Sequence, residues 1–157
     1  MFTSIIDSPM QMSTKLMSVD FFASFDNKDE AFDIFVLRPD TENSMEYKLI
    51  AKFTPQIMHK GYNSFDTSNL DIIMQKGDEL AVYLKNKLSP IPYRSLDDFG
   101  EMNDDASDDE FRPTMKFKNI ENRHDFILGQ KIAFEGFDDK IYFPISFKLF
   151  QCNYNEG

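Results

Sequence analysis

The spacing of apolar residues along residues 67–88 sets the strongest constraint on the fold that this sequence predicts. Apolar side chains and one glycine recur there at steps of three and four: Leu70, Ile73, Gly77, Leu80, Ala81, Leu84 and Leu88. Such steps place side chains on one face of an α-helix. Oxygen-bearing side chains at residues 66–68 suit the start of a helix, and Pro90 and Pro92 lie just beyond its end. We therefore expect one long amphipathic helix here.

The segments before this helix alternate between apolar and polar residues, which is the period of a β-strand. We expect strands at residues 16–25 and 31–37, joined as a hairpin through the turn-forming residues 26–29. A third strand is expected at residues 45–57. Its alternation fails only at Ile50.

The segments after the helix carry further strand patterns. We expect a short strand at residues 113–118 and a C-terminal hairpin formed by residues 132–134 and 141–149. Pro144 cannot donate to a ladder of hydrogen bonds, so the last strand is expected at an edge or at a bulge. The predicted class is α+β, with a largely antiparallel sheet and one long helix packed on a face.

Length and composition predict a single domain over residues 1–157. A chain of 18.4 kDa with 41% hydrophobic residues, 17 of them Phe, has enough large side chains for a core. Residues 1–14 show no clear period and are expected to form an irregular arm. The single cysteine, Cys152, cannot form an intramolecular disulfide, and no run approaches the roughly 20 apolar residues that cross a bilayer. We expect a cytoplasmic protein without a membrane partner.

Negative charge is concentrated in one stretch, residues 97–110, which we call the acidic segment. Eight of its fourteen residues are Asp or Glu, and it holds no Lys or Arg. The chain as a whole has a net charge of −10, so the other 143 residues contribute only −2. An otherwise nearly neutral domain therefore carries one local site that suits a basic partner or a cation. We expect residues 95–112 to form an acidic loop.

The side chains that usually carry catalysis or bind metals are sparse. His59 has no second candidate ligand beside it in the sequence. Glu121 and His124 have the i,i+3 spacing of a di-iron motif, but that site needs the motif twice and it occurs here once. Cys152 follows the last expected strand and has no candidate base beside it. The sequence has no Gly-rich phosphate loop and no zinc motif. We therefore expect a non-enzymatic protein without a metal or cofactor.

Calcium binding by the acidic segment fails a direct test of spacing. Oxygen ligands at Asn103, Asp105, Ser107 and Asp109 alternate as they do in an EF-hand loop. However, the sixth position is Asp108 where Gly is required, and the twelfth is Thr114 where Glu is required. No dedicated calcium site is expected.

Aromatic residues lie among the carboxylates, which favours a protein partner. Aromatic side chains supply buried contact area, while charges speed and orient the encounter with a basic surface. A chain with a pI near 4.6 would repel the phosphates of nucleic acid, so a basic protein is the expected partner. The predicted partner-binding residues are Asp97, Asp98, Phe99, Glu101, Asp104, Asp105, Asp108, Asp109, Glu110 and Phe111.

In size, acidity and expected α+β pattern, the chain resembles the small acidic immunity proteins of bacterial toxin–immunity systems, including those of contact-dependent inhibition. The segment DDFGEMNDDASDDEF, at residues 97–111, is the part of the sequence that carries the resemblance. The resemblance implies a stoichiometric inhibitor that occludes the active site of a cognate toxin, such as a nuclease. It transfers no individual residue roles.

Three other interpretations remain open at this point. In the first, the acidic segment is an inert, solvated loop. In the second, the protein is a phage-type anti-defence protein that mimics DNA, although such mimicry requires carboxylates spread along an extended face. A ligand-binding domain or enzyme with a pocket between sheet and helix, holding His59 or His124, is the third. The oligomeric state is also open.

Overall fold

Antiparallel β-strands make up almost all of the computed structural model. It describes residues 2–6, 9–24, 31–41, 45–84, 90–92, 94–95, 115–119, 126–134 and 141–152. Within these ranges the only helical element is a single 3-10 turn, η1 (Ser68–Leu70). The strands form two larger sheets and one small one.

The larger sheet has six strands in the order β10-β4-β3-β7-β1-β9, and every neighbouring pair is antiparallel. Its strands are β1 (Phe2–Ile6), β3 (Phe32–Pro39), β4 (Glu46–Phe53), β7 (Glu79–Leu84), β9 (Met115–Asn119) and β10 (Lys131–Ala133). Because β10 and β9 end this order, they form its two opposite edges. We call it the six-stranded sheet.

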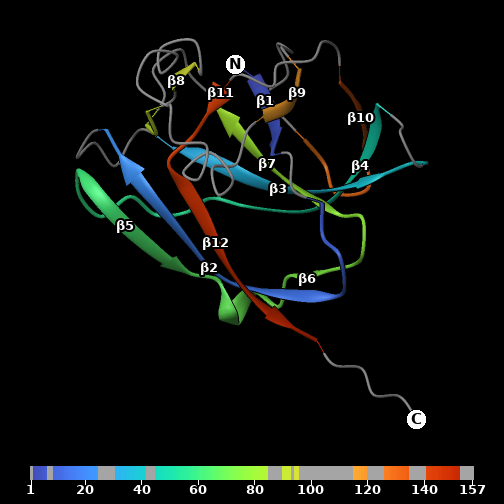
Figure 1. The fold of residues 1–157 in the computed structure, drawn as a ribbon, viewed down its shortest axis with the longest axis horizontal. Helices are drawn as coiled ribbons and strands as arrows, with labels where there is room; N and C mark the ends of the chain where they lie inside the picture. Colours follow the sequence, from blue (N-terminus) through green and yellow to red (C-terminus); the bar gives the residue numbers. More distant parts are fainter. Residues whose placement is uncertain are drawn as a thin grey trace, which may run out of the picture.

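A four-stranded sheet lies beside it, with β12, β2 and β5 side by side and β6 paired with β2 (Figure 1). Its strands are β2 (Thr14–Ala23), β5 (Gly61–Asp66), β6 (Ile73–Met74) and β12 (Ile145–Gln151). The small sheet pairs β8 (Arg94–Ser95) with β11 (Ile141–Tyr142).

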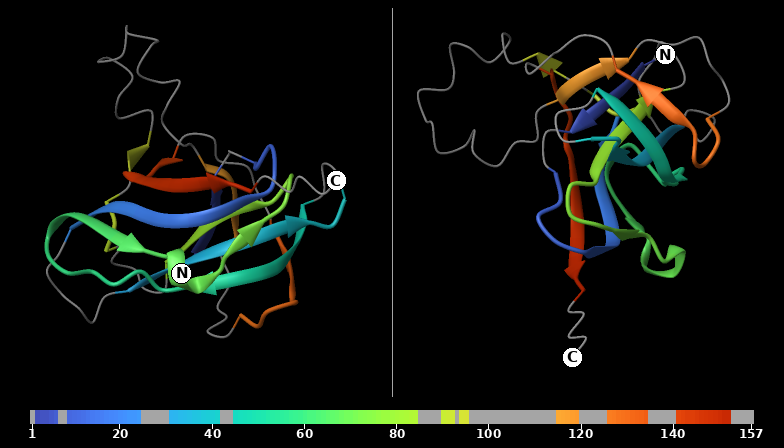
Figure 2. Two further views of the ribbon diagram at one scale, coloured as in Figure 1. Left: turned by 90° about the horizontal axis from the view of Figure 1, so that it is seen from below. Right: turned by 90° about the vertical axis from the view of Figure 1, so that its right-hand side faces the viewer.

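The main hydrophobic core lies between the two larger sheets, which Figure 2 shows as two layers. Phe21 of β2 packs edge-on against Phe32 of β3, with ring centroids 5.0 Å apart. Alternate residues of each strand enter this core because successive side chains of a strand point to opposite faces. Ile34 and Val82 come from the six-stranded sheet, and Val19 comes from the four-stranded sheet.

A second core covers the other face of the six-stranded sheet. It contains Ile5, Phe35, Leu37, Tyr47, Leu49, Ala81, Tyr83, Phe126, Ile132 and Phe134. The rings of Phe35, Tyr83 and Phe126 lie with centroids 5.0–5.3 Å apart. The central strand β7 is therefore buried on both faces, and all six of its residues are buried.

The predicted helix at residues 67–88 is wrong, and with it the α+β class. The part of this range that the structure describes holds η1, the short strand β6, a turn and strand β7. Gly77 has φ +91° and occupies the third position of the turn, in which the N–H of Asp78 donates to the carbonyl of Gln75. The apolar spacing thus arises from a turn and from a strand that is buried on both faces.

Both predicted hairpins are also wrong, although their strands exist. β2 and β3 are consecutive in the chain but belong to different sheets, so they do not pair with each other. At the C-terminal end, β10 pairs with β4, β11 pairs with β8, and β12 pairs with β2. Residues 2–6, part of the expected irregular arm, form β1 between β7 and β9.

The strand predicted at residues 45–57 is confirmed over residues 46–53 as β4, whereas residues 54–57 are not strand, and its irregular position has a structural cause. Val36 pairs with Ala51 while Leu37 pairs with Leu49, so Ile50 is the extra residue of a β-bulge. The strand predicted at residues 113–118 is confirmed in β9. The edge position that Pro144 predicts is confirmed too, because β12 is an edge strand.

Candidate functional site

The acidic segment connects two strands of different sheets. The predicted partner-binding residues, from Asp97 to Phe111, lie outside the described residues, as do the tested calcium positions, Glu121 and His124. Before the segment, β8 pairs with β11. After it, β9 pairs with β1 at an edge of the six-stranded sheet. The segment therefore lies, in chain order, between two paired strands.

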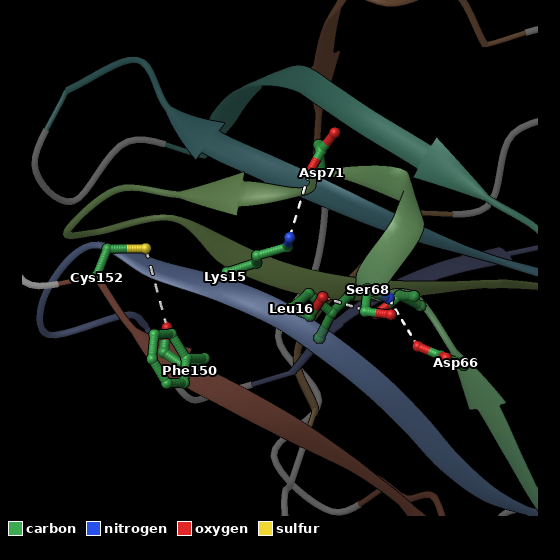
Figure 3. A network of polar contacts seen from close by, with 8 residues as sticks. Lys15, Leu16, Asp66, Ser68, Asp71, Phe150 and Cys152 are labelled. Atoms are coloured by element: carbon green, nitrogen blue, oxygen red, sulfur yellow. Dashed lines mark hydrogen bonds and ion pairs between the residues drawn. The ribbon is translucent and has the colours of Figure 1, made fainter.

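The two remaining candidates for chemistry, His59 and Cys152, each contact backbone carbonyl groups. His59 is exposed, and its Nδ1 lies 2.9 Å from the carbonyl oxygen of Lys60. The backbone N–H of Cys152 donates to the carbonyl of Ser13, and its Sγ lies 4.0 Å from the carbonyl of Phe150 (Figure 3). In the part of the chain that the structure describes, no group of three or more His, Cys, Asp or Glu side chains is placed to hold a metal ion.

A buried amide fixes the turn before β5. Asn63 is 4% exposed, and its Oδ1 accepts hydrogen bonds from the backbone N–H groups of Met58 and His59. Its Nδ2 donates to the carbonyls of His59 and Gly61, both at 2.9 Å. The amide therefore satisfies four backbone groups around this turn.

Polar contacts after β5 hold η1 against β2 (Figure 3). Thr67 is buried, and its hydroxyl donates to the carbonyl of Leu16 at 2.8 Å. Lys15 pairs with Asp71 at 3.2 Å. Hydrogen bonds from the side chain and the backbone N–H of Ser68 lower the pKa of Asp66 below its usual value, because they favour the ionised carboxylate.

The outer face of the four-stranded sheet carries an exposed aromatic pair. Phe22 of β2 lies directly opposite Tyr62 of β5, and the two are 45% and 63% exposed. In the next row Ser64 donates to the carboxylate of Asp20. The pKa of Tyr62 is raised above its ordinary value, mainly by local desolvation, and further by the charge of Asp20 and a hydrogen bond to it.

A buried ion pair links β3 to the turn that precedes β7. Asp78 is completely buried, and Arg38 binds its carboxylate through two hydrogen bonds. These hydrogen bonds and the neighbouring charge raise the pKa of Arg38, although desolvation acts in the opposite direction. Sequence reasoning missed this pair and Asn63, although the Lys-Gly-Asp run at residues 76–78 carried a turn signal.

Comparisons with known proteins leave the family open. No family model matches the chain, and no curated protein or solved structure matches it either. No helix of the described residues has the length and apolar character needed to span a membrane.

Proposed function

We propose that this protein is a non-enzymatic binding protein that docks on a basic protein through its acidic segment, as an immunity protein occludes a toxin. The observation that carries the proposal is the concentration of charge −8 in residues 97–110, against −2 in the rest of the chain. Phe99 and Phe111 lie within and beside these acids and supply apolar contact area.

The β-scaffold supports this proposal because it provides paired strands on both sides of the segment. β9 adds to the six-stranded sheet beside β1, and β8 joins the small sheet with β11. The alternative of a pocket between sheet and helix no longer has a basis, since residues 67–84 form no long helix.

A direct test uses the product of the gene immediately upstream as the partner, assayed for nuclease activity. The activity should fall in proportion to added protein and vanish near a 1:1 ratio. A variant with Asn at positions 97, 98, 104, 105, 108 and 109, where the chain has Asp, should no longer inhibit. A control variant, in which the exposed Asp71 and Asp66 become Asn and two charges are removed instead of six, should inhibit like the unaltered protein. Full inhibition by the six-site variant would refute the proposal.

A further inference from the structure

The turn that precedes β10 holds two aliphatic side chains in solvent. Ile127 and Leu128 are 65% and 56% exposed. The turn is well ordered by hydrogen bonds: the N–H of Gln130 donates to the carbonyl of Ile127, and the N–H of Ile127 donates to the side chain of Gln130. Gly129, with φ +86°, sits at its third position. Fixed, adjacent aliphatic side chains at such exposure suggest a contact surface.

Backbone bonds to β4 fix the turn on the six-stranded sheet. The N–H of Gly129 donates to the carbonyl of Leu49, and the N–H of Leu49 donates to the carbonyl of Gln130. Beside the turn, Phe126 is buried in the second core against Phe35 and Tyr83. The exposed pair therefore stands on a rigid base.

Lysines surround this turn. Lys52 donates to the carbonyl of Phe126, and Lys48 lies beside Gly129. Lys48 also pairs across the strands with Lys131 of β10 on one side and with Arg38 of β3 on the other. We call Ile127, Leu128, Lys48, Lys52 and Lys131 the lysine-flanked turn.

Arg38, Lys48 and Lys131 form a row of three cations across neighbouring strands. Two of them have an acidic partner. Arg38 has Asp78, and Lys131 lies 3.5 Å from Asp40. No acidic group of the described ranges pairs with Lys48, which lies between them. Like charges directly opposite one another destabilise a sheet, so an external anionic group at Lys48 would relieve this row.

The complement of such a surface is a set of carboxylates with apolar side chains among them, and the acidic segment of this chain has that composition. Phe99 and Met102 lie between its eight acidic residues, and Phe111 directly follows the segment. Opposite charges would orient the contact while the apolar side chains bury area against Ile127 and Leu128.

The acidic segment and the lysine-flanked turn are joined to opposite edges of the six-stranded sheet. The acidic segment leads into β9, whereas the lysine-flanked turn lies beside β10, at the opposite edge of the six-stranded sheet. Five strand-to-strand steps separate these edges, about 24 Å along the sheet. We propose that the lysine-flanked turn of one copy binds the acidic segment of a second copy, head to tail. This inference does not rest on the proposed function, but a basic partner would compete for the same segment.

Sedimentation velocity over a range of protein concentrations tests this proposal. The average mass should rise with concentration at about 50 mM salt, and the association should weaken at least about tenfold at about 500 mM. The variant K48E/K131E and the variant L128D should remain monomeric. The control K60E/K148E changes the net charge by the same amount at exposed lysines away from the turn, and should associate like the unaltered protein.

Mixing two defective variants distinguishes a head-to-tail contact from other modes. K48E/K131E retains the acidic segment, and the six-site Asp→Asn variant retains the lysine-flanked turn. Each alone should be monomeric, and together they should form a 1:1 dimer, because a heterologous contact needs one intact half from each copy. Failure of the mixture to pair would overturn the proposal.

Other results would also overturn it, independently of the inhibition assay. They are a monomeric unaltered protein at every concentration, and association that K48E/K131E leaves unchanged. Binding of the monomer to vesicles of anionic phospholipid, lost in K48E/K131E, would identify the turn as a membrane contact instead.

Discussion

Arg38 binds the buried carboxylate of Asp78 in a bidentate pair, with Nε 2.8 Å from Oδ1 and Nη2 3.0 Å from Oδ2. The backbone N–H of Gln75 also donates to Oδ2, at 2.9 Å. The Asp78 side chain is fully buried, whereas that of Arg38 is 36% exposed. The pair therefore joins the end of β3 to the turn before β7 and neutralises a carboxylate that is out of reach of water.

Replacing Arg38 with Met should destabilise the protein by about 3 kcal/mol, because it leaves a buried charge without its partner. Arg38→Lys should recover only part of this loss, since an ammonium group cannot reproduce the two parallel bonds. Chemical denaturation measures both changes. Lys60→Met, at an exposed site, is the control and should change stability by less than about 0.5 kcal/mol. A loss below about 1 kcal/mol for Arg38→Met would show that water compensates for the arginine.

The helix predicted over residues 67–88 shows where sequence reasoning fails for this fold. All six residues of β7 are buried, and the last five, residues 80–84, appear in the sequence as a continuous apolar run without alternation. A run of this kind cannot be distinguished from a helix by period alone. Gly77 supplies a positive φ for the turn, and in the sequence its position coincides with a step of the helical pattern.

Strands with one exposed face were easier to predict. β4 alternates between Glu46, Tyr47, Lys48 and Leu49 as exposed and buried residues, and its bulge falls at the one irregular position. Pairing was not predictable, because residues adjacent in sequence, such as those of β2 and β3, separate into different sheets. Nothing local in the sequence specifies which sheet each strand joins.

Asn63→Ala should cost about 2 kcal/mol, because four backbone groups around the turn lose their partner. Asn63→Asp keeps the acceptor but loses both donors to the carbonyls of His59 and Gly61. Its carboxylate would have a raised pKa, so this variant should be least stable at neutral pH and should regain stability as the pH falls. Denaturation at several pH values measures this. Asn69→Ala, at an exposed site of η1, is the control.

Ser68→Ala should raise the pKa of Asp66 toward its ordinary value, because it removes the side-chain hydrogen bond and leaves the backbone one. A lowered pKa in the folded state stabilises the protein above the unfolded value, near pH 4, and this contribution is lost as the pH falls through the lowered pKa. The stability difference between the two proteins should therefore be present at neutral pH and disappear in acid. NMR titration of the Asp66 carboxyl checks the shift. An unchanged pKa would assign the effect to the backbone bond alone.

Gly129→Ala should destabilise the protein by about 1 kcal/mol, because alanine resists a φ of +86°. The new Cβ would lie 3.9 Å from Cε of Lys48, which is an ordinary contact, so the cost comes from the backbone. Gly129→Asn should cost less, since Asn tolerates this region better. Thermal unfolding of both variants, with the exposed-site change Asn69→Ala as control, checks the order. Equal losses for Ala and Asn would contradict the backbone explanation.

The composition of the candidate site could be predicted from the sequence, but its setting could not. The acids from Asp97 to Glu110 are visible as a run, whereas their attachment between β8 and β9 depends on long-range pairing. The exposure of Ile127 and Leu128 was equally hidden, because a short apolar pair gives no indication of which side faces solvent.

The affinity for the upstream gene product, measured by calorimetry at low and high salt, tests the role of the acidic segment most directly. We expect the unaltered protein to bind at a 1:1 ratio and to lose at least about tenfold in affinity between about 50 and about 500 mM salt. The six-site Asp→Asn variant should bind weakly at both concentrations. Equal affinity of the two proteins, with no salt dependence, would contradict the proposal that the acidic segment is the docking surface.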